Sequence, residues 1–153
     1  MSRLLIIYAS QTETGRARRL VDAAAQGAAG EPSVACEVLR ADAAGPDDLR
    51  RSDGLLLVTP EHFGYMAGKL KDFFDRTFYP VEGQTVGLPY ALIVSCGNDG
   101  RGTVSAVERI VAGYRWKPVS DAQIVVGDPD ASALQRAHDT GLALATGIAL
   151  GAF

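Results

Sequence analysis

The sequence has little of what marks several large classes of protein. Its 153 residues include only two cysteines, Cys36 and Cys96, and one tryptophan. Two cysteines make neither a disulfide framework nor a metal-ligand spacing, so we expect a reduced, cytoplasmic setting and no metal site. No apolar run reaches the roughly 20 residues that span a membrane, and no cleavage site follows the first apolar run. We therefore expect neither a membrane anchor nor a signal peptide.

The net charge is small, and motifs that bind nucleotides are missing. The net charge is −3 and the pI about 5.3, which gives no reason to expect nucleic acid or a membrane surface as a partner. A Gly-x-Gly-x-x-Gly fingerprint and a Gly-Lys-Ser/Thr loop are both missing, which argues against a dinucleotide fold and a P-loop. Triads and paired acid–base carboxylates are also missing, so we predict no catalytic side chain.

The apolar residues that are present form five short runs separated by helical patterns. Predicted strands cover residues 4–8, 33–39, 53–59, 90–95 and 122–126, and predicted helices cover 17–28, 66–78, 104–114 and 129–148. Asp128 is expected to cap the last helix with Pro129 at its first position, and residues 79–89 are expected to form turns. Strands that are apolar throughout are typical of a parallel sheet covered on both faces. We predict one α/β domain over residues 1–153, a doubly wound, five-stranded parallel sheet of order 2-1-3-4-5 with helices on both faces.

The segment after the third predicted strand is the most informative. Thr59–Met66 carries a proline, a glycine and aromatic side chains, and a helical pattern follows it. Ligands of parallel α/β sheets bind beyond the carboxyl ends of the strands. Flat side chains and backbone freedom at such an end suit a planar ligand. The alternative is an ordinary βα loop with a structural proline, in which His62 is a surface residue.

Two further loops would lie at the same edge of the sheet. Ser10–Ala17 combines hydroxyls with a predicted helix N-terminus, which favours an anion site, although Ser10, Thr12 and Thr14 could instead simply cap the helix. Ser95–Gly102 holds three glycines with Asn98 and Asp99. It could offer backbone N–H groups to a ligand, or be only a turn before the next helix.

Together these segments resemble the flavodoxin-like NAD(P)H-dependent FMN reductases. The residues that match the family's third-strand motif are Thr59, Pro60, Glu61, Gly64, Leu70, Lys71, Phe73, Asp75 and Arg76. The first loop resembles the flavodoxin phosphate loop but is two residues longer, with Glu13 among the added residues. The resemblance implies that FMN is bound by Ser10, Gln11, Thr12, Thr14, Gly15, Arg16, Ala17, Pro60, Glu61, His62, Phe63, Gly64, Tyr65, Cys96, Gly97, Asn98, Asp99, Gly100, Arg101 and Gly102.

The function that the resemblance implies is an FMN-binding oxidoreductase. It would take electrons from NAD(P)H and pass them to a quinone, a flavin or a similar acceptor, either a small molecule or a redox partner protein, and it could act as a homodimer. Two alternatives stay open: a flavodoxin-type electron carrier, and a protein of this fold that has lost flavin. The second depends on Glu13, whose charge would repel a phosphate. We expect the lengthened loop to bulge outward and to carry Glu13 into solvent.

Overall fold

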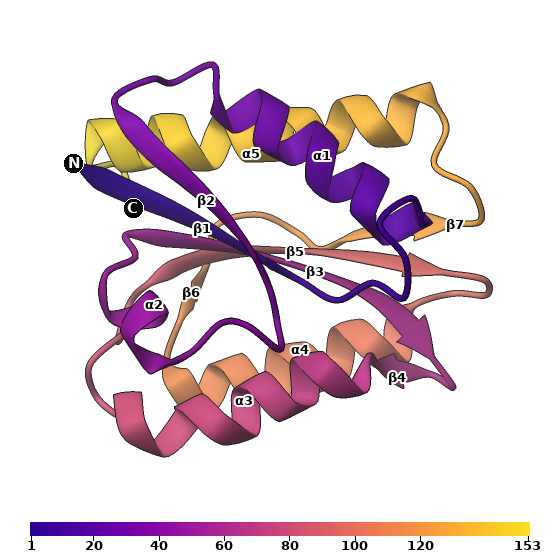
Figure 1. The fold of residues 1–153 in the computed structure, drawn as a ribbon, viewed down its shortest axis with the longest axis horizontal. Coiled ribbons are helices and arrows are strands. Elements are labelled where there is room, and N and C mark those ends of the chain that lie inside the picture. The colour runs from indigo at the N-terminus through magenta and orange to yellow at the C-terminus, as the bar shows by residue number, and fades with distance from the viewer.

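The computed structural model describes residues 1–153 and has a central sheet between two pairs of helices (Figure 1). The elements, in chain order, are β1 (Ser2–Tyr8), α1 (Arg16–Ala28), β2 (Val34–Arg40), α2 (Pro46–Arg50), β3 (Gly54–His62), β4 (Tyr65–Met66), α3 (Gly68–Val81), β5 (Pro89–Cys96), α4 (Arg101–Tyr114), β6 (Lys117–Pro118), β7 (Gln123–Val126) and α5 (Ala131–Leu150). No helix combines the length and the apolar character that crossing a membrane requires.

The strand order confirms the predicted fold class. The order is β2-β1-β3-β5-β6, with β7 paired to the other end of β5 and β4 paired to β3. All pairs are parallel except the short pairing of β3 with β4. The predicted strands one to five correspond to β1, β2, β3, β5 and β7, so their order is the predicted 2-1-3-4-5. The carboxyl ends of β1, β3 and β5 therefore meet at one edge, at the right of Figure 1.

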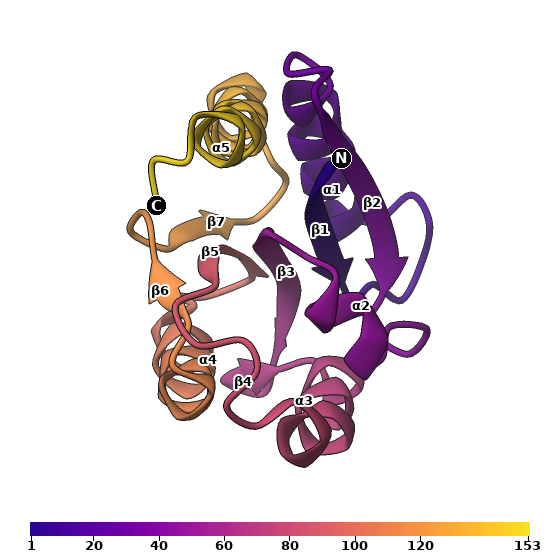
Figure 2. The same cartoon turned by 90° about the vertical axis from the view of Figure 1, so that its left-hand side faces the viewer.

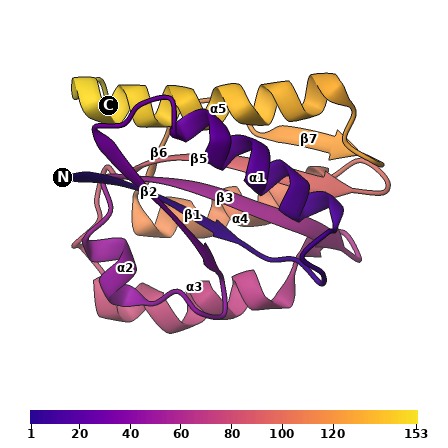
Figure 3. The same cartoon turned by 45° about the horizontal axis from the view of Figure 1, so that its top comes forward.

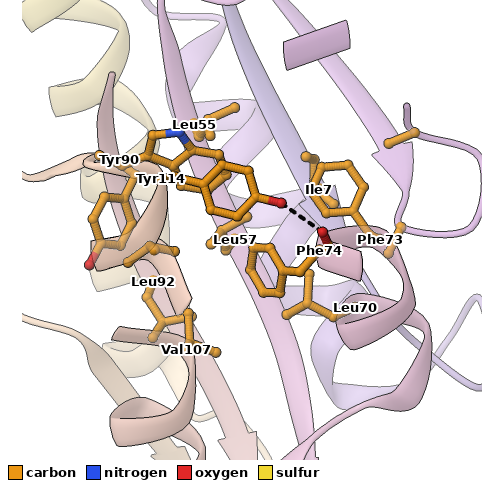
Figure 4. Close-up of a cluster of buried hydrophobic side chains, with 14 of the residues drawn as sticks. Ile7, Leu55, Leu57, Leu70, Phe73, Phe74, Tyr90, Leu92, Val107 and Tyr114 are labelled. Atoms are coloured by element: carbon orange, nitrogen blue, oxygen red, sulfur yellow. Dashed lines mark hydrogen bonds between the residues drawn. The ribbon is translucent and has the colours of Figure 1, made fainter. Parts of the chain in front are cut away.

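The helices α3 and α4 cover one face of the sheet, and α1 and α5 cover the other (Figure 2). The two layers bury different kinds of side chain. Below the sheet, α3 and α4 enclose an aromatic core (Figure 4), in which Tyr114 donates a 2.9 Å hydrogen bond to the carbonyl of Phe74. Above it, α1 and α5 lie side by side (Figure 3). They bury mainly alanine, glycine and branched aliphatic residues. A Cβ atom on Gly27 or Gly141 would lie 1.9 Å from a carbonyl oxygen of the facing helix, so this close crossing requires glycine.

Three local expectations are wrong. First, β3 continues to His62 and turns back as β4, so α3 begins at Gly68 rather than 66. Second, α3 extends through Pro80 to Val81 into the stretch predicted as turns. A proline in the last turn removes a single helical hydrogen bond, which a buried helix tolerates. Third, Asp130 rather than Asp128 caps α5, accepting a 2.8 Å hydrogen bond from the N–H of Ala133.

Candidate functional site

Three loops meet at the carboxyl edge of the sheet and enclose a hollow of about 300 Å³. We call it the first hollow. The loop between β1 and α1, the end of β3 and the end of β5 all contribute. Its lining residues are Ser10, Gln11, Thr12, Gly15, Arg16, Ala17, Pro60, Glu61, His62, Ser95, Cys96 and Gly97. Segments that lie far apart in the sequence are thus brought together as predicted, and Ser95 joins the predicted set.

The β1–α1 loop presents polar groups to this hollow. The Ser10 hydroxyl donates a 2.5 Å hydrogen bond to the Thr12 carbonyl and accepts one of 3.3 Å from the Thr12 N–H. Helix α1 starts after Gly15, which provides no side-chain cap. The interpretation that Ser10, Thr12 and Thr14 simply cap this helix is therefore wrong. The N–H groups of the first turn of α1 have no helical partner and stay free for an anion.

Gly15 fits closely between the hydroxyls of this loop. A Cβ atom at position 15 would lie 2.9 Å from Thr12 Oγ1 and 3.3 Å from Ser10 Oγ. No acidic residue occupies the first turn of α1, and Arg16 lines the hollow. Hydroxyls, free N–H groups and a cation around a position without a side chain make a donor set that suits a phosphate dianion. Thr14 lies outside the lining, on the exposed part of the loop.

An aspartate on the β7–α5 loop faces Arg16. Arg16 Nε donates a 2.9 Å hydrogen bond to Asp128 Oδ1, and Arg19 reaches the same oxygen at 3.4 Å. These guanidinium groups, Arg16 first, lower the pKa of Asp128. Asp128 is therefore engaged by α1, and the cap of α5 is Asp130. The pairs are solvent-exposed, so they orient Arg16 more than they stabilise the fold.

Glu13 points away from the first hollow. Its carboxylate pairs with Arg18 and, at 3.2 Å, with Arg40 at the end of β2, and its side chain is 63% exposed. Arg18 also donates a 2.8 Å hydrogen bond to the Tyr8 hydroxyl, and both guanidinium groups lie over the Tyr8 ring. The longer loop is thus tied to the neighbouring strand end, with the carboxylate on its outer side.

The end of β3 folds back in a tight hairpin. Phe63 and Gly64 form its turn and have φ angles of +54° and +74°, the left-handed conformation that two-residue hairpin turns use. Phe63 is fully exposed at the tip, although the left-handed conformation costs a residue with a side chain about 1–2 kcal/mol. Phe63, Gly64 and Tyr65 do not line the first hollow, whereas Pro60, Glu61 and His62 do.

The β5–α4 loop leads into the first turn of α4, which packs against this hairpin. A Cβ atom on Gly102 would lie 2.4 Å from the carbonyl oxygen of Gly64. Asp99 accepts a 2.9 Å hydrogen bond from the N–H of Arg101, and the cap of α4 is Gly100 in a left-handed conformation. Of this loop only the first part reaches the first hollow. Asn98, Asp99, Gly100, Arg101 and Gly102 lie outside its lining, while Cys96 and Gly97 are within it.

Thr103 is a residue at the site that the sequence analysis does not identify. It is fully buried in the first turn of α4, and its hydroxyl donates a 2.9 Å hydrogen bond to Glu61 Oε2. Its position directly after the glycine-rich loop is the only signal that the sequence offers. Nearby, burial and then the charge of Glu61 raise the pKa of the Cys96 thiol. Both effects disfavour the thiolate, which is the reactive form of a cysteine, so Cys96 is better suited to lining the hollow than to acting as a nucleophile.

A second hollow of about 530 Å³ adjoins the first. The two share Ser10, Gln11, Pro60 and His62, so they form one continuous concave surface. The second hollow adds Arg40 and Lys69, whose side chains both pair with Asp42, at 3.2 and 2.9 Å. Lys69 is the main cause of the lowered pKa of Asp42. His62 is the titratable side chain that lines both hollows.

Comparison with known families decides what kind of protein carries this site. The family of NADPH-dependent FMN reductases matches residues 43–129, more than half of the chain, including the end of β3 and the β5–α4 loop. The chain belongs to this family. The predicted resemblance is thereby confirmed, and the protein is an FMN-dependent oxidoreductase of flavodoxin-like fold.

Individual relatives agree with this assignment. The chain is 29% identical over 150 residues to an NAD(P)H dehydrogenase (quinone) of Acidithiobacillus ferrooxidans, covering 84% of this chain and 72% of that protein. It is 28% identical over 111 residues to a flavodoxin of Aquifex aeolicus, covering 72% and 59% respectively.

Solved structures support the fold. An archaeal flavodoxin superimposes with a TM-score of 0.84 at 16% identity, covering 96% of this chain and 99% of that one. A flavodoxin, WrbA-like protein of Agrobacterium tumefaciens gives a TM-score of 0.79 at 17% identity, covering 98% and 99%.

Proposed function

We propose that FMN lies in the first hollow and passes electrons from NAD(P)H to a quinone or a similar small acceptor. The observation that carries the proposal is the division of the hollow into two ends. At one end are the hydroxyls of Ser10 and Thr12, the free N–H groups of α1 and Arg16. At the other are Pro60 and Glu61 beside Gly97, where a Cβ atom would meet open space. One end suits a phosphate and the other leaves room for a flat ring.

The cofactor contacts are proposed in two groups. The phosphate would be bound by the β1–α1 loop, through Ser10, Gln11, Thr12, Thr14, Gly15, Arg16 and Ala17. The ring would lie between the β3–β4 hairpin, residues 60–65, and the β5–α4 loop, residues 96–102. In the second group Phe63, Gly64, Tyr65 and residues 98–102 lie outside the hollow's lining, so they would form the rim around a bound ring.

The reaction that we propose needs no protein nucleophile. Bound FMN supplies the redox chemistry, because its ring accepts hydride and then gives up electrons. The chain's own residues bind the phosphate, hold the ring at the sheet edge and leave a concave surface beside it for the reductant and the acceptor. The relative that acts on quinones supports a small-molecule acceptor. A homodimer is a further proposal, which light scattering of the purified protein would test.

The flavodoxin-type electron carrier is the second candidate. The Aquifex aeolicus relative supports it. Carriers of this kind are usually strongly acidic, because charge steers them to basic partners, and a net charge of −3 is weak for that role. The third alternative is a protein that has lost flavin. It depended on repulsion between Glu13 and a phosphate, and Glu13 points outward and is paired with two arginines.

Two measurements test the proposal. The absorbance spectrum of the purified protein, with mass analysis of the extracted cofactor, should reveal FMN rather than FAD. Mixing with NADPH in the absence of air should then bleach the flavin absorbance, and adding a quinone should restore it. A colourless protein that ignores added FMN contradicts the proposal as a whole. Bound FMN that NADPH does not reduce favours the electron carrier.

A further inference from the structure

Glu61 is held in the wall of the first hollow at two points. Its backbone pairs with Met66 in the β3–β4 hairpin, and its Oε2 atom accepts the 2.9 Å hydrogen bond from Thr103. Thr103 is fully buried, so this donor is itself fixed by the packing of α4 on the sheet. The other carboxylate oxygen, Oε1, has no hydrogen-bond partner in the chain. The result is a charged acceptor with one oxygen anchored and one oxygen free.

The charge of this carboxylate acts on the site. Glu61 lines the first hollow together with Cys96 of the neighbouring strand. After burial, the negative charge of Glu61 is the next cause of the raised pKa of the Cys96 thiol. Glu61 thus places a negative charge beside Cys96 in the lining of the hollow.

The chemistry of a carboxylate limits what Glu61 can contact. An ionised carboxylate only accepts hydrogen bonds. The oxidised isoalloxazine ring has a single N–H group, at the imide N3, and its other polar ring atoms are acceptors that a carboxylate would repel. When a hydride reaches the neutral ring, the ring gains one negative charge until a proton joins it. A fixed carboxylate therefore favours the oxidised ring over the reduced one.

We propose that Thr103 is a positioning residue that holds Glu61 for the imide edge of the flavin, and that the fixed charge weakens binding of reduced FMN relative to oxidised FMN. This inference rests on the proposed position of FMN in the first hollow. It assigns one edge of the ring to Glu61 and gives the protein a means of setting the reduction potential. Thr103 would act only through Glu61, without touching the cofactor.

The test measures two quantities on the apo-protein reconstituted with FMN: the dissociation constant of oxidised FMN and the reduction potential relative to free FMN. The shift of the potential gives the ratio of the dissociation constants of the reduced and oxidised forms, and the first quantity then gives the dissociation constant of reduced FMN. Glu61→Gln should lower this ratio by roughly fivefold, since the negative charge beside the proposed ring position is removed. Thr103→Val should weaken the binding of oxidised FMN by roughly three- to tenfold. It should also lower the ratio, but by less than Glu61→Gln does. Thr103→Ser should resemble the wild type.

Thr77→Val is the matched control. Thr77 is equally buried and its hydroxyl donates a 2.8 Å hydrogen bond to the Phe73 carbonyl, but it packs against Tyr114 in the aromatic core. This variant should lose stability and leave the ratio unchanged. A merely structural role for Thr103 would give the same pattern as Thr77 and would overturn the inference.

The remaining outcomes are equally decisive. If Thr103→Val does not fold, Glu61→Gln decides, because Glu61 is partly exposed and its loss removes no core packing. An unchanged ratio in Glu61→Gln overturns the inference while the proposed function stands. A wild-type protein that binds no FMN rejects the proposed function itself.

Discussion

The two ends of the site are built by different means. At the proposed phosphate end, polar side chains hold the β1–α1 loop, with Glu13 bridging Arg18 and Arg40. At the ring end, backbone lies against backbone, since Gly102 passes directly beside the carbonyl of Gly64. A side chain can change its rotamer to accommodate a new atom, whereas closely packed backbone segments cannot shift without disturbing their neighbours. The phosphate end should therefore tolerate substitution that the ring end does not.

Replacing a glycine by alanine at each end tests this contrast. The replacement at the ring end should give the largest of the predicted effects. Gly102→Ala places a Cβ atom 2.4 Å from a carbonyl oxygen, so the hairpin and α4 must separate. We expect a loss of about 1–3 kcal/mol in the free energy of unfolding and weaker binding of both FMN and riboflavin. Gly15→Ala meets the Thr12 hydroxyl at 2.9 Å, and that side chain can rotate. Urea denaturation should show a smaller loss for Gly15→Ala, and equal losses would refute the contrast.

Arg16→Ala should distinguish the two ends of the site, because it should weaken the binding of FMN but not that of riboflavin. Arg16 lines the first hollow and is oriented by Asp128, so its loss should weaken FMN by about tenfold, as expected for a charge-assisted hydrogen bond to phosphate. Riboflavin has no phosphate, and its affinity should not change. Arg109→Ala on the exposed face of α4 controls for the lost charge. Fluorescence titration measures both ligands. An equal loss of riboflavin binding would place Arg16 near the ring.

The sequence predicts the parts of this site better than their connections. Continuous apolar strands predict the sheet order, and the sheet order brings residues 10–17, 60–62 and 95–97 to one edge. The hairpin is not predicted, because Phe63 is an unusual residue for a left-handed turn and Tyr65–Met66 is too short to register as a strand.

Long-range side-chain pairs are the other part that the sequence does not reveal. The bond from Thr103 to Glu61 and the pair of Asp128 with Arg16 join residues 42 and 112 positions apart. No local pattern encodes such pairs, because they depend on how the loops meet once the sheet has formed.

A smaller effect is expected at the tip of the hairpin. Phe63→Gly removes the strain of a left-handed residue but increases the freedom of the unfolded chain, so we expect a net gain of about 0.5–1 kcal/mol in the free energy of unfolding. Gly64→Ala, the neighbouring control, should destabilise the turn instead. If Phe63→Gly also weakens the binding of FMN or of the acceptor, the phenyl ring of Phe63 covers the bound cofactor. The strained backbone would then be retained for that contact.

The smallest effect should come from Glu13→Gln, which tests why the lengthened phosphate loop remains compatible with a phosphate. A carboxylate facing the phosphate would oppose binding, and its neutralisation would tighten FMN by about 0.5–1.5 kcal/mol at low salt. Glu13 instead lies on the outer side of the loop, where Arg18 and Arg40 already balance its charge. We therefore expect the dissociation constant of FMN to change by less than about twofold, at low and at high salt, because exposed ion pairs contribute little. Tighter binding at low salt alone would mean that the loop turns inward when FMN binds, and that the phosphate end is less firmly held than its ion pairs suggest.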